Sequence, residues 1–317
     1  MKQKVLVSID TEAPVGDEPV TKMIIGKIEN KEYGINFIMD FLDANGIKGL
    51  FFVDFAEAWD YGESKIAEVV QQIYFRGHDV GVHIHPDHMK DKNRRFLWEY
   101  TYDEQYEMIS SCTSLYEKIL CKRPLSFRAG RYSADKNTLQ VLDELGYRYD
   151  MSEFFGSRYC KIRPEVTWNQ VVKIPGLNLV EVPVTTFRSF KTPIYERYDQ
   201  IDSGMIPSEF RRVISEINKR KTVDVISMFV HSFQFIDWRM NPNSPKFNRK
   251  KNRYFKKNFC TLMENDVVFI SEADLMNITM KEFDLEFELD LSGGIKSYIY
   301  FIIRALKVIK DRLENNI

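Results

Sequence analysis

Four of the five histidines in the chain lie between residues 78 and 88, and this cluster is the clearest sign of chemistry in the sequence. His83 and His85 stand two residues apart at the end of a predicted strand, so both imidazoles point to the same side if the strand continues that far. Pro86 then ends strand pairing. Two neutral imidazoles presented together form half of a metal site, which a carboxylate from another strand usually completes.

Asp10 and Glu12 are the obvious carboxylate donors for this half-site. They follow the apolar run 5–9, which reads as a buried strand. Parallel α/β sheets build their sites at the C-terminal ends of strands, so these acids can meet the two histidines without special geometry. The alternative, a cap for a following helix, is weakened because residues 13–16 (APVG) are not helical.

Three further strand ends carry polar residues. Arg128 and Arg131 flank Gly130 after one strand, and Asp150 ends another. His231, the remaining histidine, follows the apolar run 223–230, which suggests a proton donor or acceptor near neutral pH. A purely structural salt bridge between Arg128 and Asp150 is the alternative for that pair.

The elements that must position these residues alternate in type. From residue 4 to about 151, short β-branched or aromatic runs alternate with helical patterns that stop at glycines. This order implies a parallel sheet with helices outside it, and both a barrel and an open doubly wound sheet satisfy it. From 153 to about 204 only strand-like pieces occur, at 171–174 and 179–184, which predicts an insertion with β content. The βα pattern returns at 210–217 and 223–230, and its last strand is predicted at 267–270.

Composition narrows the class of protein. The 317 residues are 44% hydrophobic and 29% charged, which excludes disorder for most of the chain. A net charge of -1 gives no global attraction to nucleic acid, and none is expected as a partner. The four cysteines form no CxxC pair, which fits a reducing compartment. Neither a signal peptide nor a run of ~18 apolar residues is found, so a cytoplasmic location is predicted.

Two segments stand apart from this pattern. Residues 246–257 carry seven basic residues and no acidic one; a solvated loop and helix start is favoured over a patch for anions. Near the C-terminus, helical spacing places one apolar stripe on a single face: Tyr298, Ile302, Leu306, Ile309 and Leu313. A helix docked on the domain is favoured, and the alternative is peripheral membrane contact through residues 298–313.

Five motifs in this order carry a resemblance: SIDTE (8–12), GHDVGVHIHP (77–86), FRAGRYSAD (127–135), GYRYDMS (146–152) and MFVHS (228–232). The set resembles the motifs of the polysaccharide deacetylase family, the chitooligosaccharide deacetylase-like carbohydrate esterases. The resemblance covers residues 4 to about 275. It implies an α/β fold, a distorted (β/α)7 barrel with parallel strands. It also implies a divalent metal, Zn²⁺ above others, and hydrolysis of an N-acetyl, or less often O-acetyl, group on a sugar.

Two departures mark the chain as divergent. The usual first motif has adjacent aspartates, whereas Thr11 separates Asp10 from Glu12 here. The usual second motif has histidines four apart, whereas Asp87 stands four after His83. The pattern is closer to members that read DxE and HxHP. Which of Asp10 and Glu12 is the base and which the ligand stays open.

The site that the resemblance implies draws on all five motifs. The predicted metal ligands are Asp10, His83 and His85, with Glu12, Asp87 and His88 as second choices. The predicted catalytic residues are Asp10, Glu12, Arg128, Asp150 and His231, where Arg128 orients the catalytic carboxylate, Asp150 supports the site and His231 protonates the leaving amine. Substrate contacts are predicted for Arg131, Tyr132, Ser152 and Trp238.

The expected domain organisation and partners follow. Residues 1–275 are predicted to be the catalytic domain, with an insertion at about 155–205, and 276–317 an extension with an amphipathic helix. The expected partner is an acetylated sugar or glycan precursor of a surface polysaccharide. The alternative is a non-catalytic member of the same fold that binds a glycan or a partner.

Overall fold

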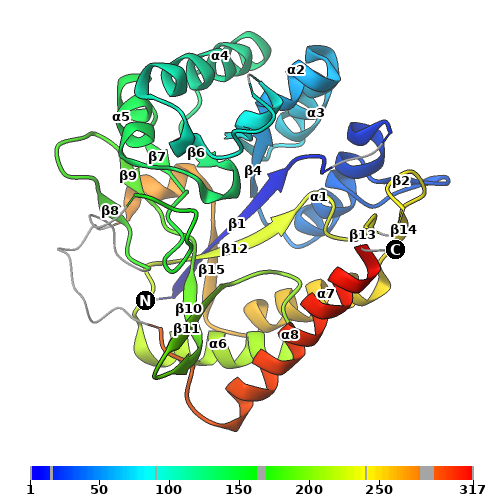
Figure 1. Cartoon of the computed structure of the whole chain (residues 1–317), viewed down its shortest axis with the longest axis vertical. Helices are drawn as coiled ribbons and strands as arrows, with labels where there is room; N and C mark the ends of the chain where they lie inside the picture. The colour runs from blue at the N-terminus through cyan, green and yellow to red at the C-terminus, as the bar shows by residue number, and fades with distance from the viewer. Residues whose placement is uncertain are drawn as a thin grey trace.

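A curled, mostly parallel sheet forms the centre of the protein (Figure 1). The computed structural model describes residues 2–14, 17–89, 91–162, 169–239, 241–278 and 289–315. The strands of the sheet are ordered β12 (Val225–His231), β1 (Gln3–Thr11), β4 (Gly49–Asp54), β5 (Asp79–Ile84), β6 (Ser126–Ala129), β7 (Tyr149–Asp150), β9 (Val180–Glu181) and β8 (Val172–Lys173). A further strand, β15 (Val267–Ile270), pairs with the start of β1, and β8 and β9 are the one antiparallel pair among the described strands of this central sheet.

Helices follow the parallel strands along the chain, as the alternation predicts. Their bounds are α1 (Ile35–Ala44), α2 (Ala58–Tyr61), α3 (Glu63–Phe75), α4 (Tyr102–Leu120), α5 (Lys136–Glu144), α6 (Pro207–Arg220), α7 (Arg249–Met263) and α8 (Ile295–Asn315). The buried faces of α1 and of α3 to α7 join the main hydrophobic cluster together with Val5, Val7 and Ile9 of β1. The helices therefore cover the outer face of the sheet.

The other face of the sheet encloses a smaller interior. A second apolar cluster there includes Leu6 of β1, Phe52 of β4 and Val225 of β12. Because side chains alternate along a strand, the residues two and four positions after Leu6, Ser8 and Asp10, point to this same inner side. Because alternate side chains of each strand face opposite sides, the outer side is apolar. The inner side becomes polar towards the C-terminal ends of the strands.

Irregular segments fill the gap between β9 and β12. Thr185 bridges to β12, since its hydroxyl donates to the carbonyl of Val225 at 3.1 Å and accepts from the amide of Ser227 at 2.8 Å. Asp202 forms an isolated parallel bridge with Phe229. These contacts close the sheet into a distorted (β/α)7 barrel, which confirms the predicted fold class.

The predicted β-containing insertion is divided between two sheets. Its strands β8 and β9 belong to the central sheet, whereas β10 (Thr186–Thr192) and β11 (Tyr195–Gln200) form a separate antiparallel hairpin. Two shorter hairpins pair β2 (Lys27–Ile28) with β3 (Lys31–Glu32) and β13 (Ile236–Asp237) with β14 (Lys246–Phe247). The basic segment 246–257 forms β14 and the start of α7, as the favoured interpretation expected.

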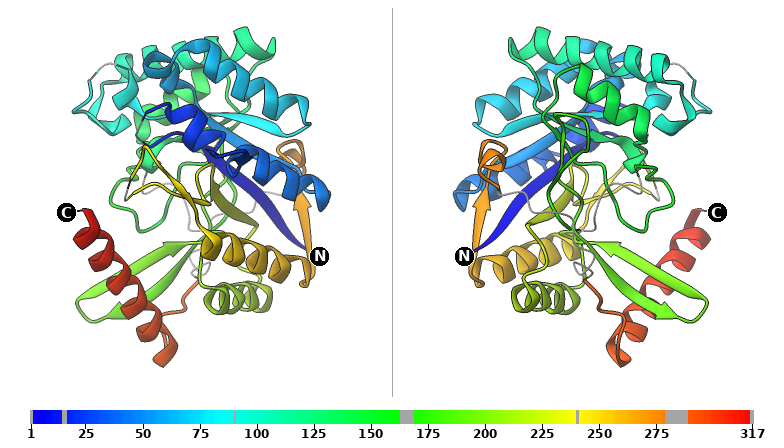
Figure 2. Two further views of the ribbon diagram at one scale, coloured as in Figure 1. Left: turned by 90° about the vertical axis from the view of Figure 1, so that its right-hand side faces the viewer. Right: turned by 90° about the vertical axis from the view of Figure 1, so that its left-hand side faces the viewer.

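The C-terminal helix α8 packs against the β10–β11 hairpin, as both side views show (Figure 2). Phe301 stacks on Phe190 with ring centroids 4.0 Å apart, and Arg304 forms ion pairs with Glu209 and Asp199. The favoured prediction, a helix docked on the domain, is confirmed, but the stripe from Tyr298 to Leu313 is not the docking face: its described members Tyr298, Ile302, Leu306 and Ile309 are half exposed or more. The helix docks through a neighbouring face because an aromatic stack and a buried ion pair lie there.

Among the described residues, no helix is long and apolar enough to span a membrane.

Candidate active site

The C-terminal ends of β1, β5, β6 and β12 bring together the residues that were predicted to carry the chemistry. Asp10 and His231 are register partners in the β1–β12 pair, and His83 and Arg128 are partners in the β5–β6 pair. His85 follows β5 with extended backbone angles, φ −100° and ψ 106°, so it keeps the alternation of the strand. Both imidazoles consequently point to the inner side, as the two-residue spacing predicted.

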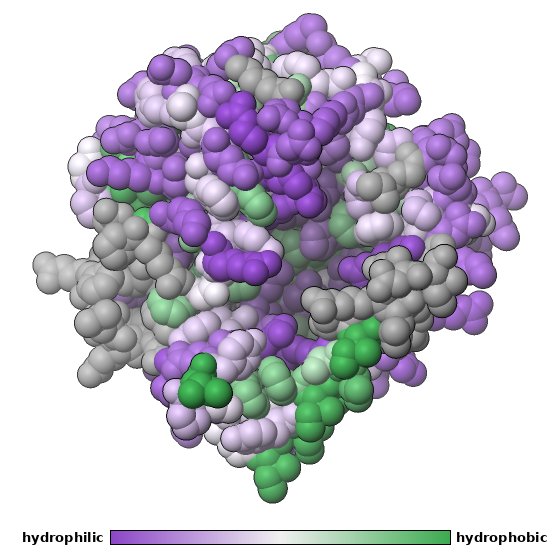
Figure 3. All heavy atoms as spheres, viewed as in Figure 1, coloured by the Kyte–Doolittle hydropathy of each residue, from purple (hydrophilic) through white to green (hydrophobic). Residues whose placement is uncertain are grey.

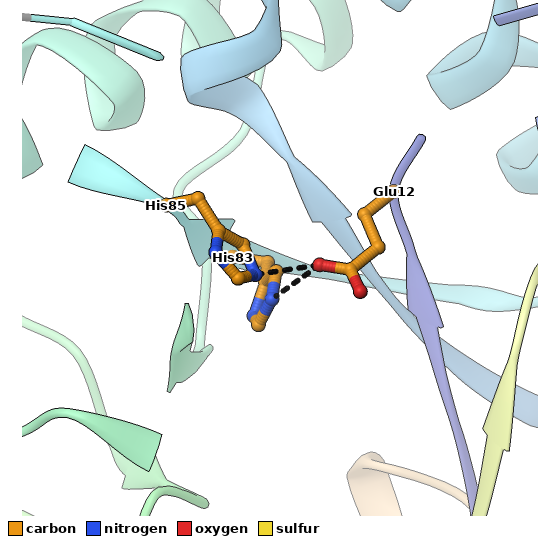
Figure 4. Close-up of side chains that lie close together, drawn as sticks. All are labelled: Glu12, His83 and His85. Carbon is orange, nitrogen blue, oxygen red and sulfur yellow. Dashed lines mark ion pairs between the residues drawn. The ribbon is translucent and has the colours of Figure 1, made fainter. Parts of the chain in front are cut away.

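Glu12 is the carboxylate that reaches both imidazoles (Figure 4). Its Oε2 lies 2.6 Å from His85 Nε2 and 3.4 Å from His83 Nε2. One ligand atom from each of these three residues lies within 4.8 Å of the others. The sequence favoured Asp10 for this position, but the geometry places Glu12 there, because the chain beyond β1 carries Glu12 toward β5.

The three side chains suit a divalent metal. His83 Nδ1 lies 2.8 Å from the carbonyl oxygen of Arg128, which can only accept, so Nδ1 donates to it and Nε2 is the ring nitrogen left to bind a metal. His83 Nε2 is also a buried atom without a hydrogen-bond partner. Two imidazoles and one carboxylate are the ligand set of several catalytic zinc sites. These residues therefore fit the metal that the motifs imply.

The charges of the group are strongly coupled. Burial raises the pKa of Glu12, but the charge of His85 and the close approach of the His83 and His85 ring nitrogens outweigh it and hold that pKa well below its usual value. Burial lowers the pKa of His83, but the Asp10 and Glu12 carboxylates outweigh it and raise that pKa to about 9. The pocket thus favours a cation beside Glu12, whether a proton or a metal ion.

Asp10 is held by Arg128 rather than by the histidines. Arg128 Nη1 donates to Asp10 Oδ1 at 2.6 Å, Nη2 donates to Ser8 Oγ at 3.0 Å and Nε donates to the carbonyl of Met151 at 3.1 Å. The guanidinium is fully buried and lies 4.3 Å above the ring of Phe52. Arg128 thereby holds the Asp10 carboxylate in one orientation at the end of β1.

His231 closes the opposite side of the site. Its Nε2 lies 3.6 Å from Glu12 Oε1, and its ring stacks on Phe233 with centroids 4.7 Å apart. A pocket of about 150 Å³ opens between these groups. Its lining consists of Asp10, Glu12, His83, His85, Ala129, Arg131, Tyr132, Gln200, Phe229 and His231.

A glycine makes room for one of the histidines. A Cβ atom added to Gly130 would lie 2.8 Å from the ring of His85 and 2.6 Å from the carbonyl oxygen of Ile84. Both distances are too short for a real contact, so the turn after β6 requires a residue without a side chain. The glycine between Arg128 and Arg131 therefore permits the close approach of β5 and β6 at the site.

The remaining predicted residues lie at different distances from the pocket. Arg131 and Tyr132 line it; Arg131 forms a bidentate ion pair with Asp87 at 2.8 and 2.9 Å, and Tyr132 donates to Gln200 at 2.7 Å. Asp87 therefore pairs with Arg131 and does not belong to the ligand group of Glu12, His83 and His85. Trp238 lies outside the pocket lining and packs edge-on to Phe233.

Asp150 and Ser152 lie beneath the site. Both are fully buried and outside the pocket lining, so the predicted substrate contact of Ser152 is not found. Ser152 Oγ donates to Asp150 at 2.6 Å and accepts from the amide of Ala129 at 2.9 Å. Burial raises the pKa of Asp150 to about 6. This pair anchors the end of β6, which agrees with the supporting role predicted for Asp150.

Three residues near the site were missed from the sequence. Gln200 reaches the pocket from the β10–β11 hairpin, which the sequence analysis did not foresee. Asp54 and Glu57 are fully buried beside the histidines. Asp54 ends a predicted strand at the same sheet edge as Asp10, and this position was the signal that could have identified it.

Comparisons with known proteins agree with this geometry. Residues 33–149 match the family described as polysaccharide deacetylase. A search of curated proteins found no match. A solved structure from Mycobacterium smegmatis, described as a candidate polysaccharide deacetylase, aligns with a TM-score of 0.55 and 15% identity over 89% of this chain and 94% of that one. At this identity the likeness concerns the fold.

Two other solved structures align less closely. The chitin deacetylase of the fungal pathogen Colletotrichum lindemuthianum aligns with a TM-score of 0.43 and 14% identity, over 85% of both chains. A CE4 family pseudoenzyme from Bacillus anthracis aligns with a TM-score of 0.44 and 13% identity, over 91% of this chain and 69% of that one. The match to the polysaccharide deacetylase family covers residues 33–149, and it agrees with the ordered motifs, while the likeness to the Mycobacterium smegmatis structure extends to the barrel fold of nearly the whole chain.

Proposed function

We propose that the protein is a metal-dependent hydrolase that removes an acetyl group, N-acetyl in preference to O-acetyl, from a sugar of a surface polysaccharide or its precursor. The observation that carries this proposal is the placement of Glu12, His83 and His85 opposite Asp10 and His231 in one pocket. A bound Zn²⁺ would polarise the acetyl carbonyl and acidify a water molecule.

The chain's own groups then have distinct tasks. Glu12, His83 and His85 would hold the metal. Asp10, held in place by its ion pair with Arg128, is placed to accept the proton of the attacking water. His231 is placed on the other side of Glu12 to protonate the leaving amine. Asp10 and Glu12 thus take the two roles that the sequence left open, base and ligand.

Release of acetate tests this proposal. Protein loaded with Zn²⁺, and separately with Mn²⁺ or Co²⁺, is incubated with N-acetylated and O-acetylated oligosaccharides, and free acetate is measured enzymatically. We expect metal-dependent release that a chelator abolishes. Tight sugar binding without acetate release in any metal form would instead support the non-catalytic alternative.

We further propose that α8 attaches the protein to an anionic bilayer surface. Its outer face exposes Ile302 by 55% and Leu306 by 60%, and hydrophobic side chains gather over this helix (Figure 3). Ile194, in the turn of the adjoining β10–β11 hairpin, is 96% exposed. Besides Arg304, which pairs with Glu209 and Asp199, the sequence of residues 296–312 carries four basic residues and one acidic one, which complements anionic lipid.

The Ile302→Glu, Leu306→Glu double variant is expected to bind phosphatidylglycerol vesicles at least about tenfold more weakly, since each buried aliphatic side chain contributes roughly 1.5–3 kcal/mol. Cosedimentation measures the binding. The control is Phe75→Glu, which changes a more exposed apolar residue on α3, away from α8. Equal binding by all three proteins, or none by the unmodified chain, would contradict membrane attachment through α8.

A further inference from the structure

A second group of potential ligands lies directly behind the first. It consists of Asp54 at the end of β4, Glu57 in the helical turn Phe55–Glu57, and His88 in the turn Pro86–His88. One ligand atom from each lies within 4.8 Å of the others. The group shares no side chain with Glu12, His83 and His85, so it can be occupied independently of them.

Both carboxylates of this group are fully buried, and each uses only one of its oxygens. Asp54 Oδ1 accepts from the amides of Ala56 at 3.0 Å and His85 at 3.3 Å, and Glu57 Oε1 accepts from the amide of Ala13. Asp54 Oδ2 and Glu57 Oε2 are buried without a hydrogen-bond partner. Unpaired buried carboxylate oxygens are costly, so two of them in one place indicate an ion or a proton between them.

His88 is oriented as metal-bound histidines are. Its Nδ1 lies 2.7 Å from Asp60 Oδ2, and Lys92 Nζ lies 2.7 Å from Asp60 Oδ1. The hydrogen bonds from Lys92 and His88 hold the pKa of Asp60 below its usual value, so Nδ1 of His88 donates to Asp60 and Nε2 is the ring nitrogen left to bind a metal. A carboxylate that receives the other ring N–H is the usual second-shell partner of a metal-bound imidazole.

We propose that Asp54, Glu57 and His88 bind a second divalent transition-metal ion, of the Zn²⁺ or Mn²⁺ class, that serves a structural purpose. One imidazole and two carboxylates suit these ions. Glu57 holds the amide of Ala13, next to Glu12, and Asp54 holds the amide of His85. An ion at this second site would therefore fix the two segments that present Glu12 and His85 to the first site.

The test isolates the second site in the full chain by disabling the first. The His83→Ala, His85→Ala variant is stripped with a chelator and titrated with Mn²⁺ or with Zn²⁺, and bound metal per chain is measured by elemental analysis and calorimetry. We expect about one ion per chain and a higher Tm with metal. Adding His88→Ala is expected to abolish both effects.

Two further variants test the contribution of Asp60 to metal binding at the second site and the specificity of that effect. Asp60→Asn leaves the three ligands in place and is expected to weaken metal binding about 10–100-fold. Asp103→Asn, an exposed aspartate at the start of α4, is expected to leave metal binding unchanged. If the His83→Ala, His85→Ala variant does not fold, the unmodified chain serves instead and should lose one of two ions on His88→Ala.

Two outcomes would overturn the second site. One is a folded double variant that takes up neither ion at 100-fold excess, which would mean that Asp54 and Glu57 share a proton instead. The other is uptake that His88→Ala does not alter. The measurement uses no substrate, so its failure is distinct from failure of the proposed hydrolase activity.

Discussion

Replacing both His83 and His85 by alanine is expected to remove the ion at Glu12 and to lower acetate release about a thousandfold or more. Two of the three ligand side chains are lost, and Glu12 alone cannot hold the ion. Metal assistance contributes several kcal/mol to such reactions, and about 4 kcal/mol corresponds to a factor of roughly a thousand. Elemental analysis and an acetate assay on the same preparation measure both effects.

His231→Ala is the matched control for this experiment. His231 lies 3.6 Å from Glu12 but outside the ligand group, so the variant should keep the ion and still lose most acetate release. Unchanged metal content and activity in the double histidine variant would refute the metal site. Unchanged acetate release in His231→Ala would refute only its role as the proton donor.

Asp10→Asn and Glu12→Gln are both expected to lose acetate release, but for different reasons. Asp10→Asn should keep the ion and lower acetate release about 100- to 10,000-fold, the usual contribution of a general base. Glu12→Gln should lose the ion together with the activity, because Glu12 is the only carboxylate within reach of both imidazoles among the described residues. Metal content therefore separates the base from the ligand.

Stability must be followed in the Asp10 variant. Arg128 is fully buried, and removing one partner of a buried ion pair costs about 3–5 kcal/mol. Thermal unfolding of Asp10→Asn shows whether the amide still satisfies the guanidinium, and activity is compared only at temperatures where the variant is folded. The reverse pattern, in which Asp10→Asn loses the ion and Glu12→Gln keeps it, would exchange the two assigned roles.

Much of the site was predictable because strand geometry has a simple period. The pairs Asp10/Glu12 and His83/His85 are each spaced by two, so each pair had to face one side of its strand. The ends of parallel strands meet at one edge of the sheet, which brought these pairs within reach of each other and of Arg128 and His231.

The β10–β11 hairpin and the docking face of α8 could not be predicted, because their patterns of apolar residues are ambiguous. The β10–β11 hairpin contains a register shift between Arg188 and Phe190, so its apolar residues do not alternate as those of a regular strand do. Helix α8 has apolar residues on more than one face, and periodicity alone does not say which face docks. The stack of Phe301 on Phe190 decides it.

By itself, the sequence determined the parallel α/β class, the strand ends that carry chemistry and the side to which each residue points, because these depend on local periodicity; the choice of a barrel came from the resemblance of the ordered motifs to a known family. Only the tertiary structure decided that Glu12 rather than Asp10 joins the histidines. That choice depends on Arg128, 118 residues away from Asp10 along the chain, occupying the interior and binding Asp10. Likewise, only the tertiary structure shows that the buried carboxylates of Asp54 and Glu57 lie next to His88 and form a candidate metal site with it. Packing between distant segments decides which side chains lie together around one ion or proton. Local sequence patterns do not contain this information.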